Sequence, residues 1–311
     1  MNDISTQDLL SFLIKKIYLI GFITFLIASL TSIVALNLQE IYRSEALLQI
    51  SDSSLSSSPS SASVSSSAMG GLASLAGLNL DSSSGSSNSK NPSYVTAKIT
   101  SRSFFDHLAS FPGVLENVFA HESFDFDSNK MIYDDTVFNS KTNEWVRIPS
   151  GLRKSKPSSL EAHEVFLSDL TISVDKKTQF IYMTYDHSSP FFAKEILELI
   201  FKEINSLQKE QDLIQSTKEL DYLTNLKSTN KLVYVEQSLS NLILKIINEQ
   251  MLASVNDEYL VEYIDEPYVA ESRIFPRRTS LVLSVTAVGF VITILSMLIF
   301  NFGFRSTQKN S

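Results

Sequence analysis

Two long uncharged runs, one near each end of the chain, constrain the fold more than any other feature of this sequence. Residues 279–304 contain no Asp, Glu, Lys or Arg, and as a helix they would span about 39 Å. A bilayer's hydrocarbon core is about 30 Å thick, so this run can cross it with some tilt. Residues 17–39 are also uncharged, and the run exceeds the apolar region of a cleaved signal peptide, about 7–15 residues. Both runs therefore predict retained transmembrane helices, in preference to a soluble core helix or a removable signal.

Basic residues beside these runs predict which side of the membrane each segment occupies. Lys15 and Lys16 precede the first run, and Arg305 and Lys309 follow the second. Short flanks rich in Lys and Arg stay in the cytoplasm, although Arg277 and Arg278 locally oppose this assignment. The predicted order is a cytoplasmic tail (1–16), transmembrane helix 1 (17–38), a periplasmic domain (39–276), transmembrane helix 2 (279–302) and a second cytoplasmic tail (305–311).

Composition excludes some classes of function. The net charge of −8 gives no electrostatic support for nucleic-acid binding. The chain has no cysteine, so it forms neither disulfides nor thiolate metal sites. Within the middle region, residues 51–90 are dominated by serine and predict a flexible loop. An apolar island at 69–80 is either a sticky patch within this loop or a segment that docks on a neighbouring subunit or on the membrane surface.

The rest of the middle region alternates between strand and helix patterns. Residues 42–50 and 258–265 show the period-two pattern of half-buried strands, and two further strands are predicted within 169–186, joined at Lys176 and Lys177. Helices are predicted at 92–111 and after a cap at Ser158 or Ser159. Residues 111–159 predict only short strands and turns.

A helix beginning at Pro190 is the most informative segment. Neither Gly nor Pro occurs again before Pro267, and an unbroken helix over 190–254 would be about 98 Å long. If strand 258–265 joins the same sheet as the strand that precedes this helix, the chain must turn back. The polar residues at 227–231 favour that turn. The predicted fold is therefore an α+β periplasmic domain with a long helical hairpin at 190–254, flanked by the two transmembrane helices.

Motifs for catalysis and for cofactor or metal binding are missing. The glycines at 70–71 are not followed by Gly-Lys-Ser/Thr, no HExxH or G-x-S-x-G motif occurs, and the four histidines are scattered in the sequence. We therefore predict no enzyme, no cofactor and no metal. The sequence instead offers three kinds of candidate interaction residues, described next. For the first kind, the alternative explanation is ordinary helix composition. For the third, it is a simple anchor at the membrane interface.

The first kind comprises small residues in the transmembrane helices that would let the helices approach closely: Thr24, Ala28, Ser32, Gly289 and Thr293. The second is a thin apolar stripe on the long helix, too narrow to be buried in its own domain and therefore a candidate oligomer seam: Leu213, Ile214, Leu220, Leu223 and Leu226. The third is a membrane junction at Pro276, Arg277 and Arg278, where proline sets the entry angle and the two guanidinium groups would face lipid phosphates.

Taken in order, these segments resemble the bacterial polysaccharide co-polymerases, the Wzz-type chain-length determinants. The resemblance spans nearly the whole chain and rests on the motifs YRSEALLQI, ITSRSFFDHL, DLTISVDKKTQFIYMTYDHSSPFFAKEI and MLASVNDEYLVEYIDEPYVAESRIFPRR. The segment before the last span has fewer prolines than is usual in the family, with Glu266 and Ala270 at positions where proline is common. The resemblance implies an inner-membrane protein that forms homo-oligomeric rings.

The function implied by this resemblance is control of the modal length of a surface glycan. The implied partners are a Wzy-type membrane polymerase, the lipid-linked glycan, the bilayer and further copies of the chain. A second possibility is the membrane subunit of a capsule or exopolysaccharide export system that partners a separate tyrosine autokinase, since no nucleotide motif or fused kinase is present here. An extracytoplasmic sensor is a third, and it would need a cytoplasmic output domain.

Overall fold

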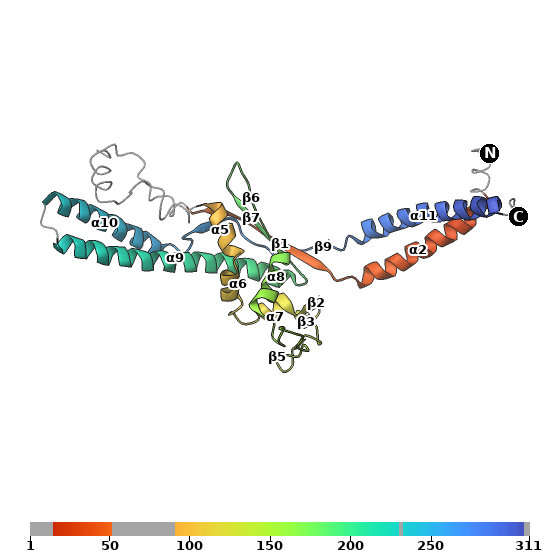
Figure 1. Cartoon of the computed structure of the whole chain (residues 1–311), viewed down its shortest axis with the longest axis horizontal. Helices are drawn as coiled ribbons and strands as arrows, with labels where there is room; N and C mark the ends of the chain where they lie inside the picture. Colours follow the sequence, from red (N-terminus) through yellow and green to blue (C-terminus); the bar gives the residue numbers. More distant parts are fainter. Residues whose placement is uncertain (1–14, 52–90, 230–232, 308–311) are drawn as a thin grey trace. The chain divides into compact units, whose positions relative to one another are not determined.

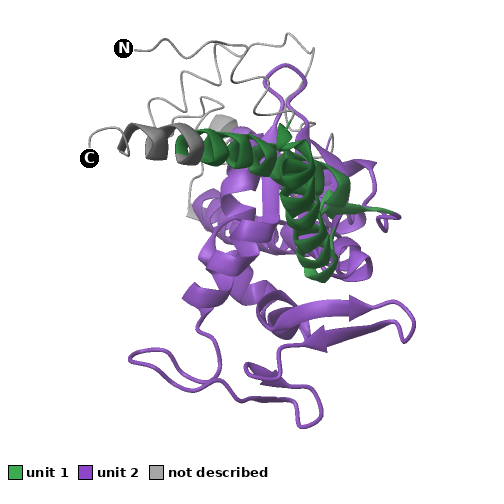
Figure 2. Cartoon of the chain, turned by 90° about the vertical axis from the view of Figure 1, so that its right-hand side faces the viewer, with its two compact units in different colours: residues 1–41, 272–311 green, residues 42–271 purple. Residues whose placement is uncertain are grey.

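The computed structural model describes residues 15–51, 91–229 and 233–307 (Figure 1). The serine-rich segment from residue 52 to residue 90, with its apolar island, lies outside the described residues. Most of both tails and residues 230–232, which include the end of the predicted turn, also lie outside them. The chain divides into two compact units, coloured separately in Figure 2. One comprises residues 1–41 and 272–311, and the other residues 42–271.

An antiparallel sheet lies at the centre of the large unit. Its strand order is β6 (Leu170–Val174), β7 (Ile181–His187), β1 (Ile41–Ile50) and β8 (Val261–Asp265). The predicted alternation in β1 is confirmed, because Tyr42, Ser44, Ala46 and Leu48 are buried. The strand predicted at 258–265 is also confirmed from Val261 onward, and it joins the same sheet as β7 through β1.

Helices α5 (Pro92–Ile99) and α6 (Arg102–Leu108) replace the single helix predicted at 92–111. The break occurs because Ser101 adopts an extended conformation and its side chain accepts a hydrogen bond from the backbone N–H of Phe104. This serine therefore caps a new helix in place of continuing the old one. The apolar residues of both helices still face the core, where Ile99, Phe105 and Leu108 are fully buried.

Residues 111–159 contain the short strands that the sequence predicts, together with a helix that it does not. The strands are β2 (His121–Asp125), β3 (Lys130–Tyr133), β4 (Phe138–Asn139) and β5 (Glu144–Trp145). The additional helix, α7 (Val114–Phe119), follows Gly113, whose φ of 81° suits glycine. The next helix, α8 (Ser159–Asp169), begins with a capping box of Ser158 and Glu161, so Ser158 is the cap of the two serines that the sequence left open.

Helix α9 (Pro190–Thr229) is rooted in the core of the large unit. Its first four turns bury Ile196, Ile200 and Ile204 completely. The side chain of Asn205 then binds β8 as a neighbouring strand would. Its amide oxygen accepts from Leu260 N–H (2.7 Å) and Val261 N–H (2.9 Å), and its amide nitrogen donates to Val261 O (3.0 Å). The buried root and this contact together fix where α9 leaves the sheet.

Beyond the core, α9 and α10 (Val233–Val255) lie side by side (Figure 1). Lys209 Nζ donates to the carbonyl oxygens of Ser254 (3.3 Å) and Asn256 (3.1 Å), and the Gln250 side-chain amide donates to Thr217 Oγ1 (3.3 Å). Of the predicted turn at 227–231, residues 227–229 are the last residues of α9, and residues 230 and 231 lie outside the described residues.

The small unit contains α2 (Ile17–Asn37), β9 (Arg273–Phe275) and α11 (Arg278–Thr307). Residues Ile17–Asn37 and Arg278–Ile299 are long and apolar enough to cross a membrane. Only 11% and 6% of their most apolar stretches are buried, whereas a soluble core helix would be mostly buried. These helices are consistent with a two-pass membrane protein.

Candidate functional site

Helices α2 and α11 pack against each other, and the small residues that the sequence singles out are all half-buried or buried. On α2, Thr24, Ala28 and Ser32 are half-buried, while many neighbouring apolar side chains are exposed. Spacing of four residues places all three on one side of the helix. The same side includes Ile20 and Ala35, the two most buried residues of α2, which the sequence did not single out.

On α11, the closest approach is at Gly289. A Cβ atom at this position would lie 3.0 Å from Cδ1 and 3.1 Å from Cγ2 of Ile27, so Ile27 occupies the space that a larger residue would need. Thr293, one turn further on, is buried, and its hydroxyl donates to Gly289 O (2.7 Å). The hydroxyls of Thr24 and Ser32 likewise donate to carbonyls of their own helix. These residues therefore contribute small size at the contact while their polar groups remain satisfied.

The membrane junction is built around Glu40, a residue that the sequence analysis missed. Arg278, the first residue of α11, donates from Nη2 to Glu40 Oε1 (2.9 Å) and from Nε to Ala35 O (3.2 Å). Arg273 of β9 donates to the same carboxylate oxygen. Glu40 therefore holds together the segment that leaves α2 and the segment that enters α11.

The three junction residues predicted from sequence have different surroundings. Pro276 is buried and Arg277 is exposed. Arg278 differs from the prediction, because its guanidinium binds within the protein where a group facing lipid phosphates was expected. Its position at Ala35 O is favourable because carbonyls in the last turn of a helix carry partial negative charge.

The predicted oligomer seam lies on a part of α9 that α10 of the same chain runs alongside. Leu213, Leu220, Leu223 and Leu226 are half-buried, and only Ile214 is exposed, at 50%. The half-buried positions recur every three or four residues along α9, where α10 of the same chain lies alongside. A partner subunit is therefore not required to cover these leucines. A sequence pattern shows that a stripe is apolar but does not show which helix covers it.

A different apolar stripe is left uncovered on α10. Its members are spaced at three or four residues and are between 38% and 80% exposed: Leu244, Ile247, Met251 and Val255. This spacing places them on one face of the helix. The stripe could have been found in the sequence from its period, but the same period is equally typical of residues that face α9.

The histidines are closer in space than in sequence. The rings of His121 and His187 lie 4.0 Å apart. His187 Nε2 donates to Asn117 O (3.0 Å), and its Nδ1 accepts from Ser189 N–H (3.1 Å) just before α9. Burial lowers the pKa of His187 to about 3 and also lowers the pKa of His121. His187 thus supports the start of α9 as a neutral side chain.

His107 and His163 also make contacts within the protein. His107 binds Glu203 (2.7 Å), and His163 binds Thr100 O (2.9 Å). Across residues 15–51, 91–229 and 233–307, no three His, Cys, Asp or Glu side chains form a group that could hold a metal ion. The surfaces that stand out are therefore the junction and the helix pair.

Comparisons with known proteins found similar chains among solved structures only. No protein-family model and no curated protein sequence matches the chain. Among solved structures, a full-length bacterial polysaccharide co-polymerase aligns over 98% of this chain and 99% of its own, with 12% identity and a TM-score of 0.39. The chain resembles polysaccharide co-polymerases.

A second solved structure of that kind is a fragment of WzzB, the polysaccharide co-polymerase from Salmonella Typhimurium. The alignment covers 76% of this chain and 100% of the fragment, with 15% identity and a TM-score of 0.31. At these identities and scores the likeness assigns no site residue to this chain.

Proposed function

We propose that the protein is a non-enzymatic regulator of the chain length of a surface polysaccharide, lipopolysaccharide O-antigen or a related glycan. It acts beside a Wzy-type polymerase on a lipid-linked glycan. The observation that carries this proposal is the architecture. A mixed α/β unit with the 40-residue helix α9 lies, in sequence, between two helices that are each long and apolar enough to cross a membrane. The order of sequence motifs described above supports the same function.

The proposal places the large unit in the periplasm and both tails in the cytoplasm, with residues 190–254 forming a protruding hairpin. Lysines before α2 and basic residues after the second span support this orientation. Reporter fusions at Asn310 and near Asn143 test it. The first should report a cytoplasmic position and the second a periplasmic one, and the same side for both would contradict the proposed topology.

Assembly into a homo-oligomeric ring is part of the proposal. The exposed stripe at Leu244, Ile247, Met251 and Val255 supports it, because a long apolar stripe on a two-helix pair is typical of a surface covered by another helix. The exposed Ile214 is the one seam candidate from the sequence that stays available for such a contact.

Deletion of the gene in its native host tests the function. Surface polysaccharide separated on a gel should lose its modal length while polymer is still made, and the wild-type gene should restore the mode. Loss of all exported polymer together with loss of tyrosine phosphorylation on a separate kinase would favour the export-subunit alternative. We also propose that the junction couples the large unit to the polymerase. Pro276→Ala combined with Arg277→Ala should then alter the glycan length distribution at normal protein levels. An unchanged distribution would leave the junction as a membrane anchor.

A further inference from the structure

A loop of the large unit, residues 146–156, presents apolar side chains to solvent. Ile148 is 85% exposed and Leu152 is fully exposed. The backbones of Ser150 and Arg153 exchange two hydrogen bonds of 3.1 Å, and Gly151 between them has a φ of 61°. This tight turn holds Leu152 away from the body of the unit. A single exposed leucine is common on proteins, but two aliphatic side chains on one short turn form a defined apolar tip.

The same loop is basic in an acidic protein. It contains Arg147, Arg153, Lys154 and Lys156, and no acidic residue occurs between Glu144 and Glu161. The whole chain carries a net charge of −8, so this concentration of positive charge is local. The side chains of Lys154 and Lys156 are exposed on the same loop as the apolar tip.

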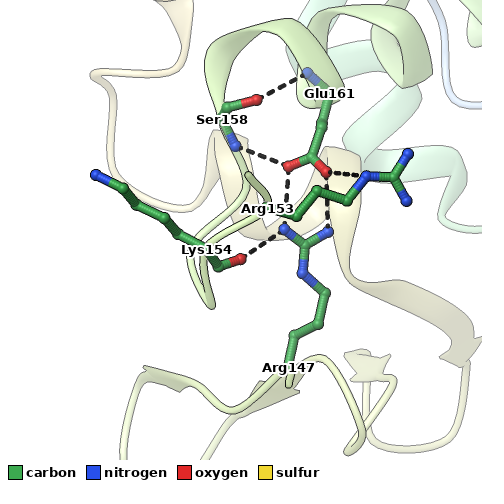
Figure 3. Close-up of polar contacts among 5 residues, drawn as sticks. All are labelled: Arg147, Arg153, Lys154, Ser158 and Glu161. Atoms are coloured by element: carbon green, nitrogen blue, oxygen red, sulfur yellow. Dashed lines mark hydrogen bonds and ion pairs between the residues drawn. The ribbon is translucent and has the colours of Figure 1, made fainter. Parts of the chain in front are cut away.

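Glu161 holds the shape of the loop through its polar contacts with Arg147 and Arg153 (Figure 3). Its carboxylate accepts from Arg147 Nη2 (3.0 Å) and pairs with Arg153 Nε (3.0 Å), while Arg147 also donates to Lys154 O (2.7 Å). Hydrogen bonding from Arg147 lowers the pKa of the Glu161 carboxyl. Because this clamp uses one carboxylate for two guanidinium groups, the loop keeps a surplus of positive charge. The clamp also sets the loop's shape without covering Ile148 or Leu152.

We propose that loop 146–156 binds the surface of a bilayer that contains anionic phospholipids. Aliphatic side chains that enter the headgroup region, flanked by Lys and Arg that face lipid phosphates, are the pattern of interfacial membrane contacts. A soluble acidic macromolecule would satisfy the lysines but would give the apolar tip no favourable environment. The bilayer is the occupant that satisfies both, and the chain's two membrane-length helices keep it close to one. This inference does not depend on the proposed role in glycan synthesis.

The absence of cysteine from the chain permits a direct test. Leu152→Cys in the full-length protein is labelled with an environment-sensitive dye and placed in nanodiscs. One set contains phosphatidylcholine alone and the other contains added phosphatidylglycerol, and both contain a spin-labelled lipid that quenches the dye. Lys177→Cys, exposed in the turn between β6 and β7, is the matched control site. We expect quenching at position 152, greater with phosphatidylglycerol, and little quenching at position 177.

Charge reversal separates the contribution of the loop's lysines to lipid binding from a general effect of the protein's net charge. In the Leu152→Cys protein, Lys154→Glu with Lys156→Glu should lower quenching to the level of the control site. Lys176→Glu with Lys177→Glu makes the same change in net charge elsewhere and should leave quenching at position 152 unchanged. Quenching at 152 that never exceeds the control site would overturn the proposal, as would equal losses from both charge reversals. If the dye at position 152 responds to added polyglutamate but not to lipid, the ligand of the loop is an acidic macromolecule.

Discussion

Asp169 and His187 lie in the same unit and change its stability with pH in opposite directions. Burial, with a smaller contribution from Asp186, raises the pKa of Asp169 from 3.8 to about 6. Between these values the folded state binds more protons than the unfolded state, so the contribution of Asp169 to stability falls as pH rises. For His187 the pKa falls from 6.5 to about 3. In that range the unfolded state binds more protons, so stability rises with pH.

Asp169→Asn is therefore expected to stabilise the large unit above about pH 6, because the uncharged amide avoids the cost of burying a carboxylate. Partial solvent exposure reduces the expected gain in the free energy of unfolding to about 1 kcal/mol. The gain should disappear below about pH 4, where the carboxyl is protonated in both states. Thermal unfolding followed through Trp145, the only tryptophan, measures both conditions.

The exposed Asp175 provides the control. It accepts hydrogen bonds from the backbone N–H groups of Lys177 and Thr178, which lower the pKa of its carboxyl. Asp175→Asn should therefore give no gain at neutral pH. If Asp169→Asn stabilised the protein equally at about pH 7.5 and about pH 3.5, burial of charge would not be the cause.

Among the elements, those with long regular patterns were predictable and those set by single contacts were not. The alternation in β1 and the stretch without Gly or Pro in α9 were visible in the sequence. The break at Ser101 was missed because a buried apolar face continues across it, and only the local hydrogen bond of this serine marks the start of the second helix. Glu40 was missed for a different reason, since its partner Arg273 lies 233 residues away and their contact depends on how the chain folds.

The contact between α2 and α11 gives a prediction at Gly289. Gly289→Ile places atoms where the Ile27 side chain lies, so overpacking should destabilise the pair by about 1–3 kcal/mol. Ile27→Ala in the same protein should recover part of the loss. Gly21 is the control, because a Cβ there meets nothing within 4 Å. Thermal stability in detergent measures all of these variants, and equal losses from Gly21→Ile and Gly289→Ile would contradict the packing described.

The exposed stripe on α10 gives a second prediction. If the protein forms the proposed ring, Leu244→Glu with Met251→Glu should dissociate it, because buried unpaired carboxylates would replace two apolar contacts. Asn241→Glu with Asn248→Glu adds the same charge at the same seven-residue spacing, at exposed positions that border the stripe. It should weaken assembly less, because it replaces no apolar contact. Light scattering of the detergent-solubilised proteins gives the mass. An unchanged mass for the leucine and methionine variant, with the helix content retained, would remove this stripe from the interface.

At the scale of the whole molecule, Glu40 joins the segment that leaves α2 to the segment that enters α11. Arg278→Glu would place two carboxylates together and lose the contact with Ala35 O. Because the pair is only partly buried, we expect a loss of about 1 kcal/mol in stability. Under the proposed function, we also expect a clear change in the glycan length distribution. Glu40→Arg in the same protein should recover part of the normal distribution.

Arg277→Glu is the comparison for this change, since Arg277 is adjacent and exposed. Gel analysis of surface polysaccharide, with immunoblots for protein level, provides the measurement. Equal effects from Arg277→Glu and Arg278→Glu would indicate a general response to charge at the membrane surface, and the specific contact with Glu40 would then have no part in setting length.

The length of α9 has a mechanical consequence. Ile196, Ile200, Ile204 and Asn205 grip only the first part of a 40-residue helix, and the helix is about 60 Å long. The part of α9 beyond Asn205 is about 36 Å long, so a rotation of about 5° at the buried root would displace the far end of the helix by about 3 Å. A rotation of α9 that is too small to rearrange the core would thus move the far end of this helix by several ångströms. A change in side-chain packing beside the buried root of α9 would then be detectable at the far end of the helix.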